Sequence, residues 1–237
     1  MNKKILITGS SGNLGKYLLQ KFKKKNFDVI SLSRKKNLEE SFLRLNCDLS
    51  RPKEVLKTFK KIKEKKINLD SMILTTGYSQ KDYKSLESKE NWEKSFNSNF
   101  YSVTNVIESY LKVFGLKKIK IIIISSIAGV KIIDAPITYS VSKNALNFYA
   151  KYKAKELAKH DIILNIISPG NIFMEKNIWG KKNKKNKKGV KLYLKKNVPL
   201  NKFVKPEEIF NLCDLLINEE MKSVTGSNII IDSGQSI

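Results

Sequence analysis

A tyrosine and a lysine four residues apart, Tyr139 and Lys143, have the spacing that most directly suggests chemistry. In a helix, residues at this spacing lie on the same face. A fixed ammonium group beside a phenol favours the phenolate, which makes the tyrosine a better proton donor and acceptor near neutral pH. Ser126 lies 13 residues before Tyr139, which leaves room for a loop that returns its hydroxyl to the phenol. These residues predict a proton-transfer centre; the alternative is an ordinary helix with a buried tyrosine.

A glycine-rich loop near the start of the chain forms a second candidate site. The apolar run Lys4–Thr8 is typical of a buried strand, and a helix is expected over residues 14–25. Glycine lets the backbone turn sharply and approach a pyrophosphate, which then rests on the helix N-terminus. Strand, glycine turn and helix in this order predict a dinucleotide-binding loop. The loop residues expected at the cofactor are Gly9, Ser11, Gly12, Asn13, Leu14 and Gly15.

The end of the next predicted strand, Asp28–Ser33, bears on which dinucleotide binds. Ser33 is followed by Arg34 and Lys35, and no acidic residue stands where an NAD site holds the ribose 2′-hydroxyl. The two cations instead suit the 2′-phosphate of NADP. The sequence therefore favours NADP(H) and leaves NAD(H) as the second choice. The other explanation is that both cations are surface residues of a lysine-rich chain.

The remaining elements alternate between strands and helices. We expect strands at residues 43–47, 69–75, 119–125, 162–168 and 227–232, and helices at residues 52–65, 90–114, 139–160 and 206–218. This alternation predicts an α/β protein with a Rossmann-like, doubly wound, seven-stranded, mostly parallel sheet and helices on both faces. Ligands of such sheets bind at the carboxyl ends of the strands. The residues expected at those ends are Gly12, Thr76, Ser126 and Pro169.

No repeat or linker divides the chain, so we expect a single domain over residues 1–237. Residues 171–198 interrupt the alternation, because they are lysine-rich and weakly periodic, which is typical of a flap over a substrate. The apolar residues of this segment predict a partly apolar pocket with a basic rim, or else only pack the flap onto the body. They are Phe173, Met174, Ile178, Trp179 and Tyr193.

The formal net charge of +24 does not by itself indicate nucleic-acid binding. Only Arg34, Arg44 and Arg51 among the 46 basic residues are arginines, whereas phosphate and base recognition favours guanidinium groups. Lysines scattered over the predicted helices are typical of solvated faces, so a nucleic-acid partner is not expected. The densest run, residues 181–196, leaves an acidic partner or substrate as an alternative.

Cysteine and histidine content excludes several other classes. Cys47 and Cys213 provide no disulfide framework, and with His160 as the one histidine no metal site is expected. The first apolar run is too short for a secretory signal, and no run has the length of a membrane span. We therefore expect a cytoplasmic protein.

Taken together, these motifs resemble the short-chain dehydrogenase/reductase family over nearly the whole chain, with the tail and length of its compact, single-domain branch. That branch includes 3-oxoacyl-carrier-protein reductases and sugar or polyol dehydrogenases. The matching motifs, in order, are Thr8-Gly9 to Gly15, Cys47-Asp48-Leu49, Trp92 with Asn99, Ile124 to Gly129, Tyr139 to Lys143, Asn165 to Gly170, and Val224 to Gly234.

The resemblance implies a role for each matching residue. Tyr139 would pass a proton to the carbonyl oxygen as hydride arrives from the nicotinamide. Lys143 would hold the nicotinamide ribose and keep Tyr139 acidic. Ser126 would stabilise charge on the substrate oxygen, and Asn99 would anchor a water that links Lys143 to solvent. The other implied cofactor contacts are Asp48 and Leu49 at the adenine, and Thr76, Gly77, Pro169, Gly170 and Ile172.

Three features depart from the compact branch. The glycine spacing is that of extended members, Leu74-Thr75-Thr76-Gly77 replaces Asn-Asn-Ala-Gly, and Met174 replaces a threonine that grips the carboxamide, unless the register shifts. The leading expectation is an NADP(H)-dependent oxidoreductase that interconverts a ketone and a secondary alcohol. Two alternatives are a sensor or scaffold that binds NADP(H) and a nucleotide-sugar-modifying enzyme, although the latter would need an added C-terminal substrate domain.

The substrate is expected to be a small carbonyl or alcohol, with anionic compounds included because of the basic rim. Relatives usually pair through the helices that correspond to residues 90–114 and 139–160, so a homodimer or homotetramer is expected.

Overall fold

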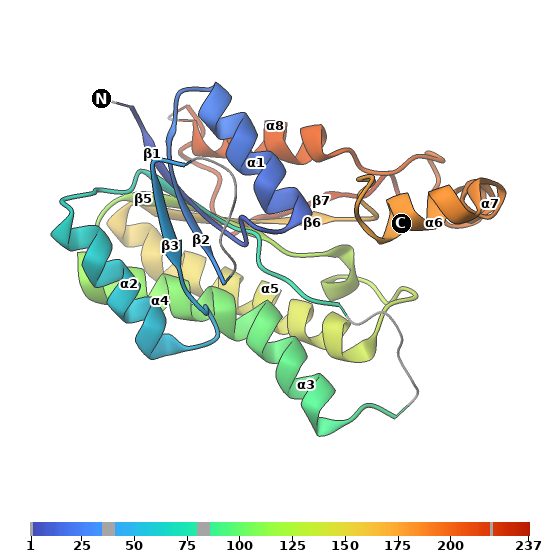
Figure 1. Cartoon of the computed structure of the whole chain (residues 1–237), viewed down its shortest axis with the longest axis horizontal. Helices are drawn as coiled ribbons and strands as arrows, with labels where there is room; N and C mark the ends of the chain where they lie inside the picture. Colours follow the sequence, from blue (N-terminus) through green and yellow to red (C-terminus); the bar gives the residue numbers. More distant parts are fainter. Residues whose placement is uncertain (1, 35–40, 80–85, 219) are drawn as a thin grey trace.

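A twisted sheet forms the centre of the protein, with helices on both of its faces (Figure 1). The computed structural model describes residues 2–34, 41–79, 86–218 and 220–237. In these residues the seven strands have the order β3-β2-β1-β4-β5-β6-β7, and every neighbouring pair is parallel. The predicted Rossmann-like fold class is therefore confirmed.

The strands begin and end within two residues of the predicted positions. Central strands read as continuous apolar runs because helices cover both faces of a parallel sheet. The strand bounds are β1 Lys4–Thr8, β2 Asp28–Ser33, β3 Leu43–Asn46, β4 Ser71–Leu74, β5 Ile119–Ile124, β6 Ile162–Pro169 and β7 Asn228–Ile231.

Two helical layers enclose the sheet. α1 and α8 cover one face, and α2, α4 and α5 cover the other, each layer burying its own apolar cluster (Figure 1). No helix in the described part of the chain is long and apolar enough to cross a membrane. The helix bounds are α1 Asn13–Lys24, α2 Pro52–Glu64, α3 Lys89–Phe96, α4 Ser102–Phe114, α5 Ile137–Leu157, α6 Ile178–Lys185, α7 Lys187–Asn197 and α8 Pro206–Ile217.

The helix predicted over residues 90–114 is not uniform. A π-helical segment, Asn97–Tyr101, separates α3 from α4. Such segments occur often at functional sites, because they turn side chains out of the regular helical register. This one carries Asn99, which is fully buried.

The flap predicted over residues 171–198 is more regular than its weak periodicity suggests, since it contains α6 and α7. Asparagine side chains begin both helices: Gly180 N donates to Asn177 Oδ1 at 3.0 Å, and Gly189 N donates to Asn186 Oδ1 at 2.8 Å. An asparagine at this position satisfies an amide that a helix N-terminus leaves free. The two asparagines are therefore a signal, present in the sequence, for the starts of α6 and α7.

Candidate functional site

The glycine loop joins β1 to α1 at the carboxyl edge of the sheet. Gly9 has φ +63°, a left-handed conformation that glycine adopts without a steric penalty. A Cβ on Gly15 would lie 2.3 Å from Gly9 O, so α1 packs directly against the back of the loop. Thr75 Oγ1 donates to Thr8 O at 2.6 Å and ties the ends of β4 and β1 together. Gly15 therefore shapes the loop from behind, and does not line the cleft as a direct contact.

A cleft of about 530 Å³ runs along this edge. It brings together nine of the predicted cofactor contacts, drawn from four separate loops: Gly9, Ser11, Gly12, Ser33, Arg34, Asp48, Leu49, Thr76 and Gly77. Predicted contacts that do not line this cleft are Asn13, Leu14, Gly15, Tyr139, Lys143, Pro169, Gly170 and Ile172. The predicted contact Lys35 lies outside the described residues.

One wall of the cleft comes from α3 and the segment that follows it, which sequence reasoning missed. The polar residues of this wall recur in the sequence at helical spacing. This polar stripe is the sequence signal that could have identified them. A solvated helix face has the same pattern, so the stripe alone does not assign them to the cleft. The missed residues on this wall are Glu90, Glu93, Lys94, Asn97, Ser98 and Ser102; Cys47, Ser50 and Thr75 line the cleft elsewhere.

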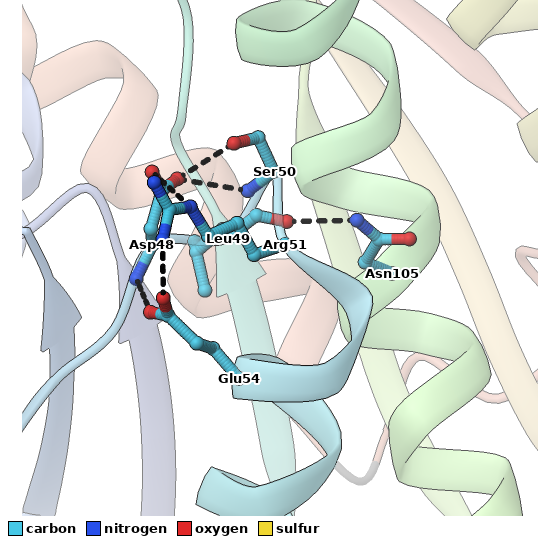
Figure 2. A network of polar contacts seen from close by, with 6 residues as sticks. All are labelled: Asp48, Leu49, Ser50, Arg51, Glu54 and Asn105. Carbon is cyan, nitrogen blue, oxygen red and sulfur yellow. Dashed lines mark hydrogen bonds and ion pairs between the residues drawn. The ribbon is translucent and has the colours of Figure 1, made fainter.

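Asp48 and Leu49 occupy a tightly bonded turn at one end of the cleft (Figure 2). Asp48 Oδ1 accepts hydrogen bonds from Ser50 N at 3.1 Å and Ser50 Oγ at 2.8 Å. Burial opposes ionisation of Asp48, but Ser50 and the nearby guanidinium groups outweigh burial, so the pKa of Asp48 is lowered. Asn105 Nδ2 donates to Leu49 O at 2.9 Å and anchors the turn to α4. The turn is therefore held in place by the protein itself.

Tyr139 and Lys143 lie near each other on α5, as their spacing predicts. Lys143 Nζ is 6.0 Å from the centroid of the Tyr139 ring. The side chain of Ser126 lies close enough to the Tyr139 hydroxyl to lower its pKa, so the loop after β5 does return to the phenol. Gly129 makes this return possible, because a Cβ there would lie 2.6 Å from the backbone of Lys143.

The electrostatics of the pair differ from the expectation that Lys143 keeps Tyr139 acidic. Burial raises the pKa of Tyr139, and the side chain of Ser126 opposes that rise. Lys143 is 2% exposed, and burial lowers its pKa to about 8. Loss of solvent around both groups thus favours their neutral forms. Ser126 is a residue that moves the pKa of Tyr139 downward.

This lowered pKa predicts how stability depends on pH. Between about pH 8 and 10.5 the unfolded chain keeps a proton on Lys143 that the folded chain has lost. The free energy of unfolding should therefore rise with pH in this window, by up to about 1.4 kcal/mol per unit. Lys143→Met removes this contribution. Urea unfolding of both proteins between about pH 8 and 10.5 should show the free energy of unfolding rising more steeply with pH in the wild type than in the variant. The same dependence on pH in both proteins would contradict the prediction.

Asn99 links the centre to the loop after β4. Its Oδ1 accepts from Tyr78 N at 2.7 Å, and its Nδ2 donates to Tyr78 O at 2.9 Å. A Cβ on Gly77 would lie 3.5 Å from both Asn99 Oδ1 and Lys143 Nζ. Gly77, which also lines the cleft, is thus the point where the cleft meets the Tyr139–Lys143 pair. The sequence did not predict that Asn99 holds this loop, and its predicted relay through water stays a prediction.

The loop after β6 is braced by the C-terminal tail. A Cβ on Gly170 would lie 2.7 Å from Asp232 Cβ, so glycine is required for this close approach. Asn171 Nδ2 donates to Tyr193 Oη at 2.9 Å, and Gln235 Nε2 donates to the same oxygen at 3.3 Å. The segment thereby connects α7, the tail and Pro169-Gly170. In the described residues, no group of three His, Cys, Asp or Glu side chains could hold a metal ion.

Comparison with known proteins covers nearly the whole chain. A family model described as "Enoyl-(Acyl carrier protein) reductase" matches residues 20–236. The chain is 30% identical to a 3-oxoacyl-[acyl-carrier-protein] reductase of Buchnera aphidicola, over 98% of this chain and 96% of that protein.

Solved structures agree with this family. 4-Hydroxyisoleucine dehydrogenase complexed with NADH has a TM-score of 0.85 at 25% identity, over 99% of both chains. ElxO with NADP bound has a TM-score of 0.90 at 24% identity, also over 99% of both chains, and this likeness concerns the fold. The chain therefore belongs to the short-chain dehydrogenase/reductase family of oxidoreductases, which act on CH–OH and C=O groups with NAD(P).

Proposed function

We propose that the protein interconverts a ketone and a secondary alcohol with NADP(H), using Tyr139 as the general acid and base. The observation that carries this proposal is the meeting of Tyr139, Ser126 and the buried Lys143 beside Gly77, at the end of the cleft. Few structural roles would require a lysine to be buried next to a phenol at a ligand-binding edge.

The residues present fit a dinucleotide. The left-handed turn at Gly9 and the absence of side chains at Gly9 and Gly12 leave room for a pyrophosphate against the N-terminus of α1. Asn13 and Leu14 begin that helix. Asp48 and Leu49 would hold the adenine, and Arg34 would hold the 2′-phosphate. Ser33, Thr76, Pro169, Gly170 and Ile172 would complete the contacts. The bound cofactor supplies the hydride; the protein supplies its position.

The chain's own residues would handle the proton. A raised pKa keeps the phenol of Tyr139 protonated near neutral pH, which is the form that donates to a carbonyl oxygen. Ser126 would donate to the same oxygen as charge develops on it. Lys143 would bind the nicotinamide ribose with its ammonium group, which a pKa of about 8 leaves mostly charged at neutral pH.

The test is a hydride-transfer assay with NADPH and NADH over a panel of ketones, including anionic ones, followed by the loss of reduced nicotinamide. Turnover of at least one ketone is expected. If the protein binds the cofactor and reduces none of them, the sensor or scaffold alternative replaces this proposal.

Arg34 carries the proposed preference for NADP(H). It is exposed, it lines the cleft, and its charge helps to lower the pKa of Asp48. Arg34→Ser should weaken NADP(H) binding about tenfold and leave NAD(H) binding nearly unchanged, because a charge-assisted contact to a phosphate is lost. Arg44→Ser, which removes an arginine from outside the cleft, is the matched control. A wild-type protein that is thermally stabilised by NAD(H) and not by NADP(H) would overturn the assignment.

We also place the enzyme in the cytoplasm, as one domain over residues 1–237 with a substrate flap at residues 171–198. Both cysteines are free and buried, which suits a reducing compartment. We propose pairing as a homodimer or homotetramer through α5 and the helical stretch of residues 90–114. Exposed aromatic side chains support it, since Phe148 on α5 is 74% exposed and Tyr101 in the π-helical segment is 47% exposed. If light scattering gave the mass of the monomer, 27.2 kDa, this result would contradict the pairing.

A further inference from the structure

Lysines are concentrated on α6 and α7, and neither helix contains an acidic residue. Residues 178–197 contain nine lysines and no Asp or Glu, whereas the whole chain has 46 basic and 22 acidic residues. The two helices project from the body at one end of the molecule (Figure 1). All nine lysines are exposed, and together they form what we call the lysine face: Lys181, Lys182, Lys184, Lys185, Lys187, Lys188, Lys191, Lys195 and Lys196.

This charge arrangement is unfavourable for the helices that carry it. Lys187, Lys191 and Lys195 follow one another at intervals of four on α7, and like charges at this spacing repel. The first turn of α7 has two lysines and no acidic residue, which opposes the helix dipole. No ion pair found among the described residues includes a member of the lysine face. Some lysines elsewhere are paired, as Lys153 is with Glu108 at 3.0 Å.

Contacts between aromatic rings on the inner side of α6 and α7 hold the two helices in place despite this repulsion. The rings of Trp179 and Tyr193 are 4.6 Å apart between centroids, and Phe203 is 5.1 Å from Trp179. The hydroxyl of Tyr193 is bonded to Asn171, next to the loop after β6. The lysine face is therefore a supported surface, in which Lys182 Nζ also lies 4.9 Å from the centroid of the Trp179 ring.

We propose that the lysine face binds an acidic protein surface. An ammonium group is a compact charge that suits individual carboxylates, whereas phosphate recognition favours the arginine fork, and all three arginines lie elsewhere. Insertion into a membrane surface needs a broad apolar face. Here the exposed large apolar side chains are Ile178, 47% exposed, and Leu192, 60% exposed. This proposal goes beyond the proposed reaction and holds whether or not a ketone is reduced.

The contact should be small, rapid and sensitive to salt. α7 has 11 residues and is therefore about 16 Å long, which suits a transient interface. Charge attraction between exposed groups accelerates association and is screened as ionic strength rises. Binding should therefore weaken steeply when salt is added.

Titration with fluorescent poly-L-glutamate, a model of an acidic protein surface, tests the proposal. The face variant replaces four exposed lysines, Lys184→Gln, Lys188→Gln, Lys191→Gln and Lys195→Gln. The control variant removes the same charge from exposed positions of α2, with Lys53→Gln, Lys57→Gln, Lys60→Gln and Lys61→Gln. The face variant should bind about tenfold more weakly than the wild type, and the control should change less than about twofold. The face variant loses repulsion along α7 but also loses Lys184 and Lys195 from the last turns of α6 and α7, where a positive charge suits the helix dipole. These effects oppose each other, so its melting temperature should change little.

Three results would overturn the proposal. Absence of binding at low salt would remove it, and equal weakening in both variants would assign the effect to bulk charge. The third result uses duplex DNA and phosphatidylglycerol vesicles as competing probes. If either binds more tightly than poly-L-glutamate and is lost in the face variant alone, the partner is a nucleic acid or a membrane instead.

Discussion

Tyr139→Phe is expected to lower kcat for ketone reduction by roughly 10²- to 10⁴-fold, the usual contribution of a positioned acid–base group. Phenylalanine keeps the ring and removes only the hydroxyl, whose pKa the side chain of Ser126 lowers in the wild type. The fold should therefore persist, and NADP(H) should still stabilise the variant against heat. Steady-state kinetics with any ketone that the wild type reduces, together with thermal shift, measure the two effects separately.

Tyr152→Phe is the matched control for this experiment. Tyr152 lies on the same helix but is 67% exposed, so its hydroxyl faces solvent. Its removal should leave kcat within about twofold of the wild-type value, as is usual for surface substitutions. Full activity in Tyr139→Phe would exclude Tyr139 as the proton donor, whereas loss of cofactor binding in that variant would show that the substitution damages the site itself.

Among substitutions that add one methyl group to the cofactor loop, Gly15→Ala is expected to be the most disruptive. The added Cβ would lie 2.3 Å from Gly9 O and 2.8 Å from Gly9 C, so it meets backbone that no side-chain rotation can relieve. Overpacking of this kind costs about 3 kcal/mol of stability, since the loop or α1 must shift. A loop displaced by about 1 Å would also lower kcat/KM for NADP(H) roughly 100-fold.

Gly12→Ala provides the graded comparison. Its Cβ would meet Gly9 O at 3.2 Å with no other heavy atom close by, and its φ of −80° suits any residue. Urea unfolding should therefore show a much smaller loss of stability than in Gly15→Ala. Unfolding curves for Gly15→Ala that coincide with the wild type would mean that α1 does not press against the loop.

Local patterns in the sequence predicted most of the fold. Apolar runs predicted all seven strands to within two residues, because a buried parallel strand leaves a continuous apolar signature. Prolines marked the starts of α2 and α8, where a missing amide costs nothing. The π-helical segment at Asn97–Tyr101 has no such signature. It accompanies the hydrogen bonds that Asn99 makes to Tyr78, a residue distant in the chain.

The sequence by itself determined the fold class, the glycine loop and the spacing of Tyr139 and Lys143, because each is a matter of residue type and local period. Only the tertiary structure decided how burial shifts the pKa values of that pair, since burial depends on what the whole chain packs around a group. It also placed the α3 wall in the cleft and Gly15 behind the loop. These placements join segments far apart in the chain, and no periodicity along the sequence records such a distance.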